Sequence, residues 1–285
     1  MTAIRRRLIP YLLLGPGTIW LVLFFVVPLV YMFRLSLETG IVGNLEFSWH
    51  WANYSDVLSL YDTQLIRSFL YAGAATLLAL LVSYPLAYTI AFKAGRWRNA
   101  MLFAVVAPFF TTYLIRTLAW ESILSDASPV THVLKAIGLA PNGHILATGS
   151  AVVAGLTYNF LPFMILPIYA SLDRIDVRLI EAAKDLYASS TQSFFRVTVP
   201  LSMTGVVAGV LLTFIPAAGD YINAQFLGGA DNQMIGNVIQ ALYLTQSNYP
   251  SAAALSFLLM ALIMIAVVIY IRFAGSEALM GEEAV

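Results

Sequence analysis

Six long runs without Asp, Glu, Lys or Arg limit what this chain can fold into more than any other feature of its sequence. They extend over residues 11–33, 68–92, 99–115, 136–172, 197–219 and 232–271. Each run can hold one helix of the ~20 residues needed to cross a bilayer. Hydrophobic residues make up 60% of the chain and charged residues 11%, which is unusual for a soluble domain. The sequence therefore predicts a membrane protein.

Proline and glycine inside the longer runs narrow the candidate spans. We predict six transmembrane helices, at about residues 11–33, 68–92, 99–120, 149–171, 201–218 and 251–273. No internal repeat, linker or low-complexity segment divides the chain, so we expect a single transmembrane domain over residues 1–285. The expected fold class is an all-α polytopic membrane protein with short surface helices in the outer segments 34–67, 121–148 and 219–250.

The first run also resembles part of a secretory signal peptide, because Arg5, Arg6 and Arg7 precede it. It is longer than the usual apolar region of such a peptide and lacks a small-x-small cleavage site before Arg34. We therefore interpret it as a membrane span.

Lys and Arg are distributed unevenly between the two sides of the membrane that six spans define. Eleven of them fall on the side of the N-terminus and four on the other side. Basic residues concentrate in cytoplasmic loops. Both termini, and the segment between the fourth and fifth spans, are therefore expected in the cytoplasm.

That cytoplasmic segment, residues 173–200, is longer and more charged than a simple turn requires. Apolar residues recur at three-to-four spacing on one face, at Ile175, Leu179, Ala182, Ala183 and Leu186. The charged residues Arg174, Arg178, Glu181 and Asp185 form the opposite stripe. This pattern predicts an amphipathic helix. Such a helix can lie in the groove of a soluble partner or in the lipid headgroup region, and periodicity alone favours neither.

The ends of this helix also carry signals. Asp173 is expected to cap its start, and Ser189-Ser190-Thr191 offers a stop and a second N-cap. Pro200 is suited to the entry of the fifth span. The segment is therefore predicted to form a helix-turn-helix at the membrane surface, and we call residues 173–200 the docking loop.

Within the docking loop, Glu181-Ala182-Ala183 is followed by Val197, Val199 and Pro200. The spacing resembles the consensus EAA, three residues, Gly, nine residues, Ile-x-Leu-Pro of the binding-protein-dependent ABC importer permeases. Tyr187 stands where that pattern has Gly at the bend between two short helices, and Tyr adopts positive φ less freely than Gly. We therefore expect the turn to move to Ala188-Ser189-Ser190, or the first helix to continue by one residue.

The resemblance implies a heteromeric importer in the bacterial inner membrane. Its parts would be this subunit, a second homologous permease, two copies of a cytoplasmic ATPase and an extracytoplasmic solute-binding protein, with no nucleic-acid partner. The residues implied to couple to the ATPase are Glu181, Ala182, Ala183, Asp185, Tyr187 and Pro200. The ATPase would bind ATP and Mg, because this chain has no Gly-x-x-x-x-Gly-Lys-Ser/Thr loop. The chain itself would be a non-catalytic subunit without a cofactor, surrounded by lipid, that switches by alternating access.

Several segments resemble the polyamine (spermidine/putrescine) importer permeases in particular. They are residues 107–110 with 114–116, 161–164, 219–221 with 227–229, and 235–239. Permeases for other small solutes, such as opines, amino-acid derivatives or iron, share some of these segments. The expected substrate is therefore a small cation, with another small solute as the alternative.

Ionisable residues at membrane depth are candidates for the substrate pathway. Asp220 directly follows the fifth span beside Tyr221, where a broken helix end can aim a carboxylate at a polyammonium substrate. Trp120 and Glu121 form a similar aromatic and acidic pair, and Tyr158 is a further candidate. The alternatives are a helix-end acid at the outer interface for Asp220, a belt Trp beside a solvated Glu, and a polar bridge between helices for Tyr158.

Three further residue groups complete the sequence interpretation. Asn159 is expected to bridge packed helices. Arg116 would repel a polyamine, so we expect it to form an ion pair with Glu121 or Asp126. The chain has no Cys, and its three His residues lack metal-ligand spacing, so no catalytic or metal site is predicted. A membrane-embedded enzyme would need clustered catalytic groups, and a channel would need no docking loop, so both classes are disfavoured.

Overall fold

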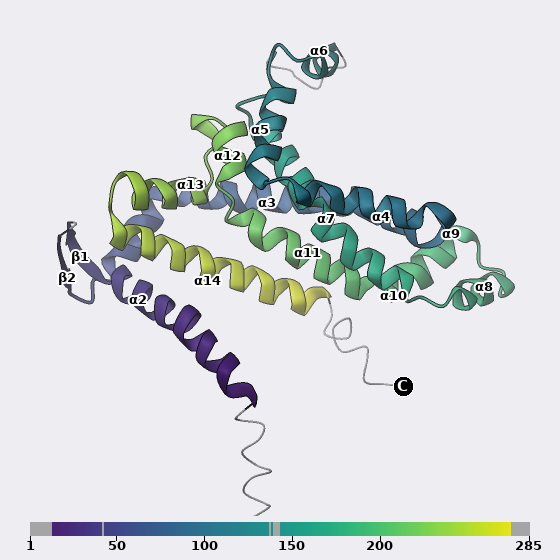
Figure 1. Cartoon of the computed structure of the whole chain (residues 1–285), viewed down its shortest axis with the longest axis horizontal. Coiled ribbons are helices and arrows are strands. Elements are labelled where there is room, and N and C mark those ends of the chain that lie inside the picture. The colour runs from purple at the N-terminus through teal and green to yellow at the C-terminus, as the bar shows by residue number, and fades with distance from the viewer. Residues whose placement is uncertain (1–12, 42, 137, 139–142, 275–285) are drawn as a thin grey trace, which may run out of the picture. The chain divides into compact units, whose positions relative to one another are not determined.

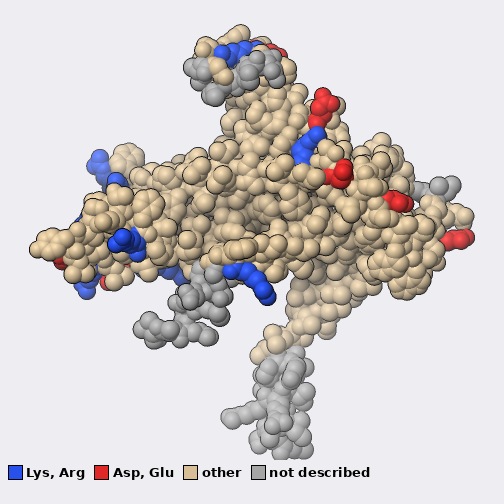
Figure 2. Space-filling model, turned by 180° about the vertical axis from the view of Figure 1, so that it is seen from behind, with Lys and Arg blue, Asp and Glu red and all other residues tan. Residues whose placement is uncertain are grey.

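The computed structural model describes residues 13–41, 43–136, 138 and 143–274, and most of them lie in helices (Figure 1). Among the described residues, four stretches are long and apolar enough to cross a membrane: Leu13–Ser36, Ala52–Phe92, Gly149–Asp173 and Tyr249–Ala274. The first contains η1 (Val22–Val26) and α2 (Val27–Ser36), and the others are α3, α7 and α14. Most of the surface seen in Figure 2 carries no charged side chain, as lipid contact requires. The predicted all-α membrane fold is confirmed.

Two further spans are bent pairs of helices. Residues Gly95–Phe110, which comprise η2 (Gly95–Trp97), α4 (Arg98–Val106) and η3 (Ala107–Phe110), meet α5 (Tyr113–Leu124) at 96°. Residues Ser190–Leu201 meet α11 (Met203–Ala218) at 62°. Counting each pair as one span gives six.

The predicted span 99–120 therefore corresponds to a bent pair of helices. Pro108 is the second residue of the short 3₁₀ segment η3, and Thr111 and Thr112 after it adopt extended conformations. The Thr112 side chain accepts a hydrogen bond from the Ile115 N–H at 3.4 Å and so caps α5. The chain restarts as a helix in a new direction.

The outer segments contain short elements. The strands β1 (Glu38–Ile41) and β2 (Asn44–Phe47) form an antiparallel hairpin in the first segment, where we expected helices, and α3 already begins at Ala52. The second segment holds α6 (Pro129–Ala136). The third holds α12 (Ile222–Leu227), η5 (Ala230–Asn232), α13 (Ile235–Gln240) and η6 (Ala241–Thr245). Helices in the last two segments agree with the prediction.

The described residues divide into two compact units. The first comprises those up to Asp62 together with Ile239–Met260. Inside it, the Asn53 side-chain amide donates to the carbonyls of Ser36 and Glu38, both at 2.9 Å, and so ties the start of α3 to the end of α2 and the base of the hairpin. The Phe33 and Phe257 rings lie 5.5 Å apart and join α2 to α14.

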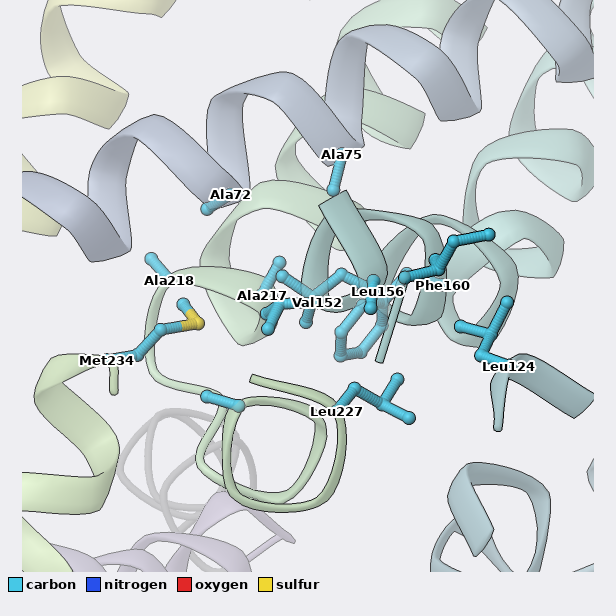
Figure 3. Packing of buried hydrophobic residues seen from close by; sticks show 13 residues of the cluster. Ala72, Ala75, Leu124, Val152, Leu156, Phe160, Ala217, Ala218, Leu227 and Met234 are labelled. Atoms are coloured by element: carbon cyan, nitrogen blue, oxygen red, sulfur yellow. The ribbon is translucent and has the colours of Figure 1, made fainter. Parts of the chain in front are cut away.

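The second unit comprises the described residues of Thr63–Val238 and those after Met260. Its core gathers small and large apolar residues from α3, α5, α7, α11 and α12 (Figure 3). Helices α7 and α11 approach closely at two glycines. A Cβ at Gly205 would lie 2.5 Å from the Pro167 carbonyl oxygen, and one at Gly209 would lie 2.9 Å from the Met164 sulfur. This close packing of small residues is typical of membrane helices.

The docking loop follows α7 and forms the expected helix-turn-helix. Its first helix is α8 (Val177–Asp185), and Asp176 caps it by accepting from the Arg178 N–H at 3.0 Å. The prediction of Asp173 as the cap is wrong, because Asp173 is the last residue of α7. Ser189 caps α9 (Ser190–Ser193) in a capping box with Gln192, as predicted. The π-helical η4 (Phe194–Thr198) and α10 (Val199–Leu201), which contains Pro200, lead to α11.

Tyr187 itself makes the turn after α8. It adopts φ of 60°, the left-handed conformation that favours glycine. Its N–H donates to the Lys184 carbonyl at 2.9 Å, and the Ala188 N–H donates to the Ala183 carbonyl at 3.1 Å. These two bonds form a Schellman motif. The expected shift of the turn to residues 188–190 is therefore wrong, because the hydrogen bonds that close α8 hold Tyr187 in the position of the family's glycine.

Replacing Tyr187 by Gly should strengthen this turn. An L residue in the left-handed region costs roughly 1–2 kcal/mol, so the Gly variant should slow hydrogen exchange at the end of α8 by about fivefold. Hydrogen exchange followed by mass spectrometry on the purified protein measures this. The β-branched variant Tyr187→Val should exchange faster, and equal or faster exchange in Tyr187→Gly would contradict the assigned turn.

Candidate functional site

The docking helix α8 has little cover within the chain. No residue of α8 is buried. Val177 and Leu179 are about half exposed, and beyond the helix Leu186 is 82% and Tyr187 98% exposed. Apolar side chains left open on a charged loop are suited to contact with a protein partner. Glu181, Ala182 and Asp185 are exposed on the same helix and Ala183 is partly exposed, while Pro200 lies apart, in α10.

The second leg of the docking loop is attached to α3. The Phe194 ring lies 5.7 Å from the Tyr84 ring and 5.6 Å from the Tyr88 ring, edge on in both cases. The hydroxyls of Tyr84 and Ser202 share a hydrogen bond of 2.8 Å at the bend before α11. The loop thus combines an open first helix with a fixed second leg.

Asp220, the leading pathway candidate, lies just beyond α11 and is 8% exposed. Its carboxylate accepts a hydrogen bond from the Tyr113 hydroxyl of α5 and one from the Asn223 N–H at 2.8 Å. The Asn223 side chain donates to the same Tyr113 hydroxyl. Two residues, Tyr113 of α5 and Asn223 of α12, therefore hold one buried carboxylate.

The hydrogen bonds continue from Asn223 into α7. The Asn159 side-chain amide donates to the Asn223 amide oxygen at 3.0 Å and to the Thr117 hydroxyl at 3.3 Å. The expected bridging role of Asn159 is thus confirmed. We call these five residues, Tyr113, Thr117, Asn159, Asp220 and Asn223, the polar cluster. A glycine makes room for it, because a Cβ at Gly155 would lie 2.7 Å from the Asn223 amide oxygen.

The side-chain hydrogen bonds from Asn159 to Asp220 form a chain in which each residue donates to the next one toward Asp220. Asn159 donates to Asn223, Asn223 to Tyr113, and Tyr113 to Asp220. A chain in this direction stabilises a negative charge on Asp220. At its other end the Asn159 amide oxygen is buried and has no hydrogen-bond partner among the described residues. One carboxylate and one free amide oxygen together can accept from a ligand rich in N–H donors.

Of the other predicted pathway residues, the structure brings Trp120 and Tyr158 together. The Trp120 and Tyr158 rings lie 5.3 Å apart, edge to face, and join α5 to α7. Glu121 is partly exposed on α5, and Tyr221 is exposed beside Asp220. Sequence reasoning missed Tyr113, Thr117 and Asn223 as partners of Asp220. The spacing of Tyr113, Thr117 and Trp120 on one face of α5 is the signal that could have found the first two.

Arg116 lies beside the polar cluster without the expected ion pair. Its guanidinium carbon lies 5.5 Å from the centre of the Phe109 ring and 5.6 Å from that of Tyr113. The residue is 8% exposed, and its Nε and Nη1 have no hydrogen-bond partner among the described residues. Asp126, one of the expected partners, instead accepts from Lys135 at 3.1 Å. The rings of Phe109 and Tyr113 therefore stabilise this cation by cation–π contact.

Comparison with known proteins shows the family to which this chain belongs. Residues 7–275 match the family described as binding-protein-dependent transport system inner membrane component. The spermidine/putrescine transport system permease protein PotB of Haemophilus influenzae is 37% identical over 256 residues, which cover 89% of this chain and 90% of that protein. PotB of Escherichia coli is 36% identical and covers 89% and 93%.

Solved structures agree on the fold. A subunit of a bacterial ABC transporter that imports the acidic polysaccharide alginate superposes with a TM-score of 0.67 at 17% identity, over 95% of this chain and 96% of that one. A chain of the MetNI methionine ABC transporter, in an inward-facing conformation, gives 0.56 at 16% identity, over 77% and 98%. The family match, the close relatives and the docking loop lead to one conclusion. This chain belongs to the inner-membrane permeases of binding-protein-dependent ABC importers.

Proposed function

We propose that this chain is one of two homologous permease subunits of an ATP-driven polyamine importer in the bacterial inner membrane, with both termini in the cytoplasm. The observation that carries the proposal is the open docking helix α8 on a chain of this family. Identity of 36–37% with spermidine/putrescine permeases supports the substrate class. A soluble binding protein delivers the solute, as the alginate transporter bound to its periplasmic protein illustrates for a protein of the same fold.

In this proposal the exposed surface of α8 docks into a cleft of a cytoplasmic ATPase, which exists in two copies and binds ATP and Mg. Glu181 and Asp185 supply charge, Ala182 and Ala183 allow close approach, and Leu186 and Tyr187 supply apolar contact. Tyr187 is 98% exposed. A large aromatic side chain there adds contact area that glycine cannot provide. The chain couples transport to ATP hydrolysis performed by its partner.

The polar cluster is the proposed contact for the substrate's ammonium groups. Asp220 supplies the counter-charge, and the free oxygen of Asn159 supplies a second acceptor. The Trp120 and Tyr158 rings add cation–π attraction of ~0.5–2 kcal/mol each where they face an ammonium group. Glu121 and Tyr221 extend this acidic and aromatic lining.

One observation favours a second candidate substrate. The Arg116 guanidinium lies over Tyr113, whose hydroxyl binds Asp220. A cation over one ring and an anion at the hydroxyl of the same ring suit a zwitterion such as an amino-acid derivative, with its ammonium group at Asp220 and its carboxylate at Arg116. Competition by polyamines and amino acids in the same uptake assay separates the two candidates.

Charge reversal on the docking helix tests the coupling role. Glu181→Lys should abolish uptake and substrate-stimulated ATP hydrolysis while the chain still inserts, because a lysine replaces the anion presented to the ATPase. Both rates are measured on the complex in proteoliposomes. Asp231→Lys, which reverses an exposed acid outside the docking loop, is the matched control and should behave as wild type. Normal coupled transport by Glu181→Lys would remove the role assigned to the loop.

Neutralising Asp220 tests the substrate contact. A hydrogen bond to a charged group contributes ~1.5–3 kcal/mol, so Asp220→Asn should raise the KM for a polyamine roughly 10- to 100-fold. Assembly with the ATPase and basal ATP hydrolysis should not change. Asp126→Asn, at the exposed ion pair with Lys135, is the control. Unchanged polyamine kinetics in Asp220→Asn would exclude Asp220 from the pathway.

A further inference from the structure

One arginine ties the start of α4 to the last turn of α7. The Nε of Arg98 donates to the Tyr169 hydroxyl at 2.6 Å, and its Nη2 pairs with the Asp173 carboxylate. Its guanidinium carbon also lies 5.2 Å from the centre of the Tyr169 ring. We call Arg98, Tyr169 and Asp173 the clasp. A guanidinium bound at two nitrogens has a fixed direction, which a single contact would not give.

The clasp lies at the root of the docking loop. Asp173 ends α7, and only three residues separate it from Val177, the first residue of α8. The other leg of the loop is fixed to α3 through Phe194. A displacement of α8 by the ATPase therefore reaches the end of α7 first, and at that end Arg98 joins α7 to α4.

Beyond the clasp, α4 has room to move. A half-open pocket of about 270 Å³ is lined by Met101, Ala104 and Val105 of α4, Pro108 of η3, and residues of α3 and α7 that include Ile165. Contact with α7 resumes where the Phe109 and Phe163 rings lie 5.1 Å apart. Closely packed helices cannot shift without overlap, whereas this open pocket leaves α4 space to move toward α7.

The chain that follows α4 leads to the polar cluster. After Phe110 the chain bends by 96° at Thr111 and Thr112, and α5 starts at Tyr113. Tyr113 donates to Asp220. A tilt of α4 therefore moves the first residue of α5, and with it the hydrogen bond that orders the carboxylate.

We propose that Arg98 is a positioning residue that transmits the movement of the docking loop through α4 to Tyr113 and Asp220. The inference rests on the proposed coupling function. Helices α4 and α7 are linked at one end by the clasp and are separated by the pocket further along, so α4 can tilt relative to α7. The clasp end of α4 lies at the docking loop, and its other end leads to the polar cluster. The Arg98 and Asp173 side chains are 39% and 36% exposed. Exposed ion pairs contribute little to stability, so loss of the clasp should uncouple the transporter rather than unfold it.

The test measures solute molecules transported per ATP hydrolysed in proteoliposomes that contain the whole complex. Arg98→Gln should assemble and hydrolyse ATP in response to solute near the wild-type rate, while transport per ATP falls roughly fivefold or more, the usual lower range of allosteric coupling. The exchanged pair Arg98→Asp with Asp173→Arg should recover most of the loss, because the ion pair is restored and the Tyr169 hydroxyl can donate to the new carboxylate.

Arg96→Gln is the matched control. Arg96 is exposed two residues earlier and lies over the Trp97 ring at 5.7 Å, so its loss removes a positive charge without touching α7. Wild-type transport per ATP in Arg98→Gln, or an equal loss in Arg96→Gln, would overturn the proposal. If Arg98→Gln fails to assemble, the exchanged pair decides, since an uncoupled exchanged pair that assembles also overturns it. Any solute that the wild-type complex carries serves as the reference, so failure of the polyamine assignment leaves the test intact.

Discussion

The structure depends on one constraint, which is that hydrocarbon offers no hydrogen-bond partners to a polypeptide backbone. A spanning helix can break only where other groups of the protein satisfy the freed N–H and carbonyl groups. The break before α5 is capped by Thr112, and the turn after α11 by Asp220, which accepts from the Asn223 N–H. Polar side chains at membrane depth are thus required by the breaks themselves. This explains why the polar cluster lies where two bent spans and α7 meet, and it is this cluster that we propose contacts the substrate.

Much of the fold follows from local signals in the sequence. The charge-free runs mark where α3, α7 and α14 cross, because each needs an uninterrupted apolar stretch. The Ser189 cap and the amphipathic pattern of residues 175–186 fix the helix-turn-helix of the docking loop, because both act within a few residues. The hairpin of β1 and β2 escaped prediction because its strands are four residues each, too short to show a period.

Features that depend on distant residues could not be read from the sequence. Asp220 was a candidate from its place after an apolar run, but its partner Tyr113 is 107 positions away in the chain. Asp173 fits a helix cap by local rules, yet it ends α7 and pairs with Arg98. Tyr187 illustrates the converse case. Its intrinsic preference argues against positive φ, and the two hydrogen bonds that close α8 override that preference.

Helix α7 joins two regions, the docking loop, which follows Asp173 at the end of the helix, and the polar cluster, to which Asn159 near the middle of the helix belongs. We propose that a polyamine bound at the polar cluster governs ATP hydrolysis through the docking loop. The most direct measurement is ATP hydrolysis by the complex of this chain with its ATPase, second permease and binding protein, with spermidine, putrescine and an uncharged solute supplied in turn. We expect stimulation by the polyamines and none by the uncharged solute. Stimulation by the uncharged solute alone, or equal rates with all three, would contradict it.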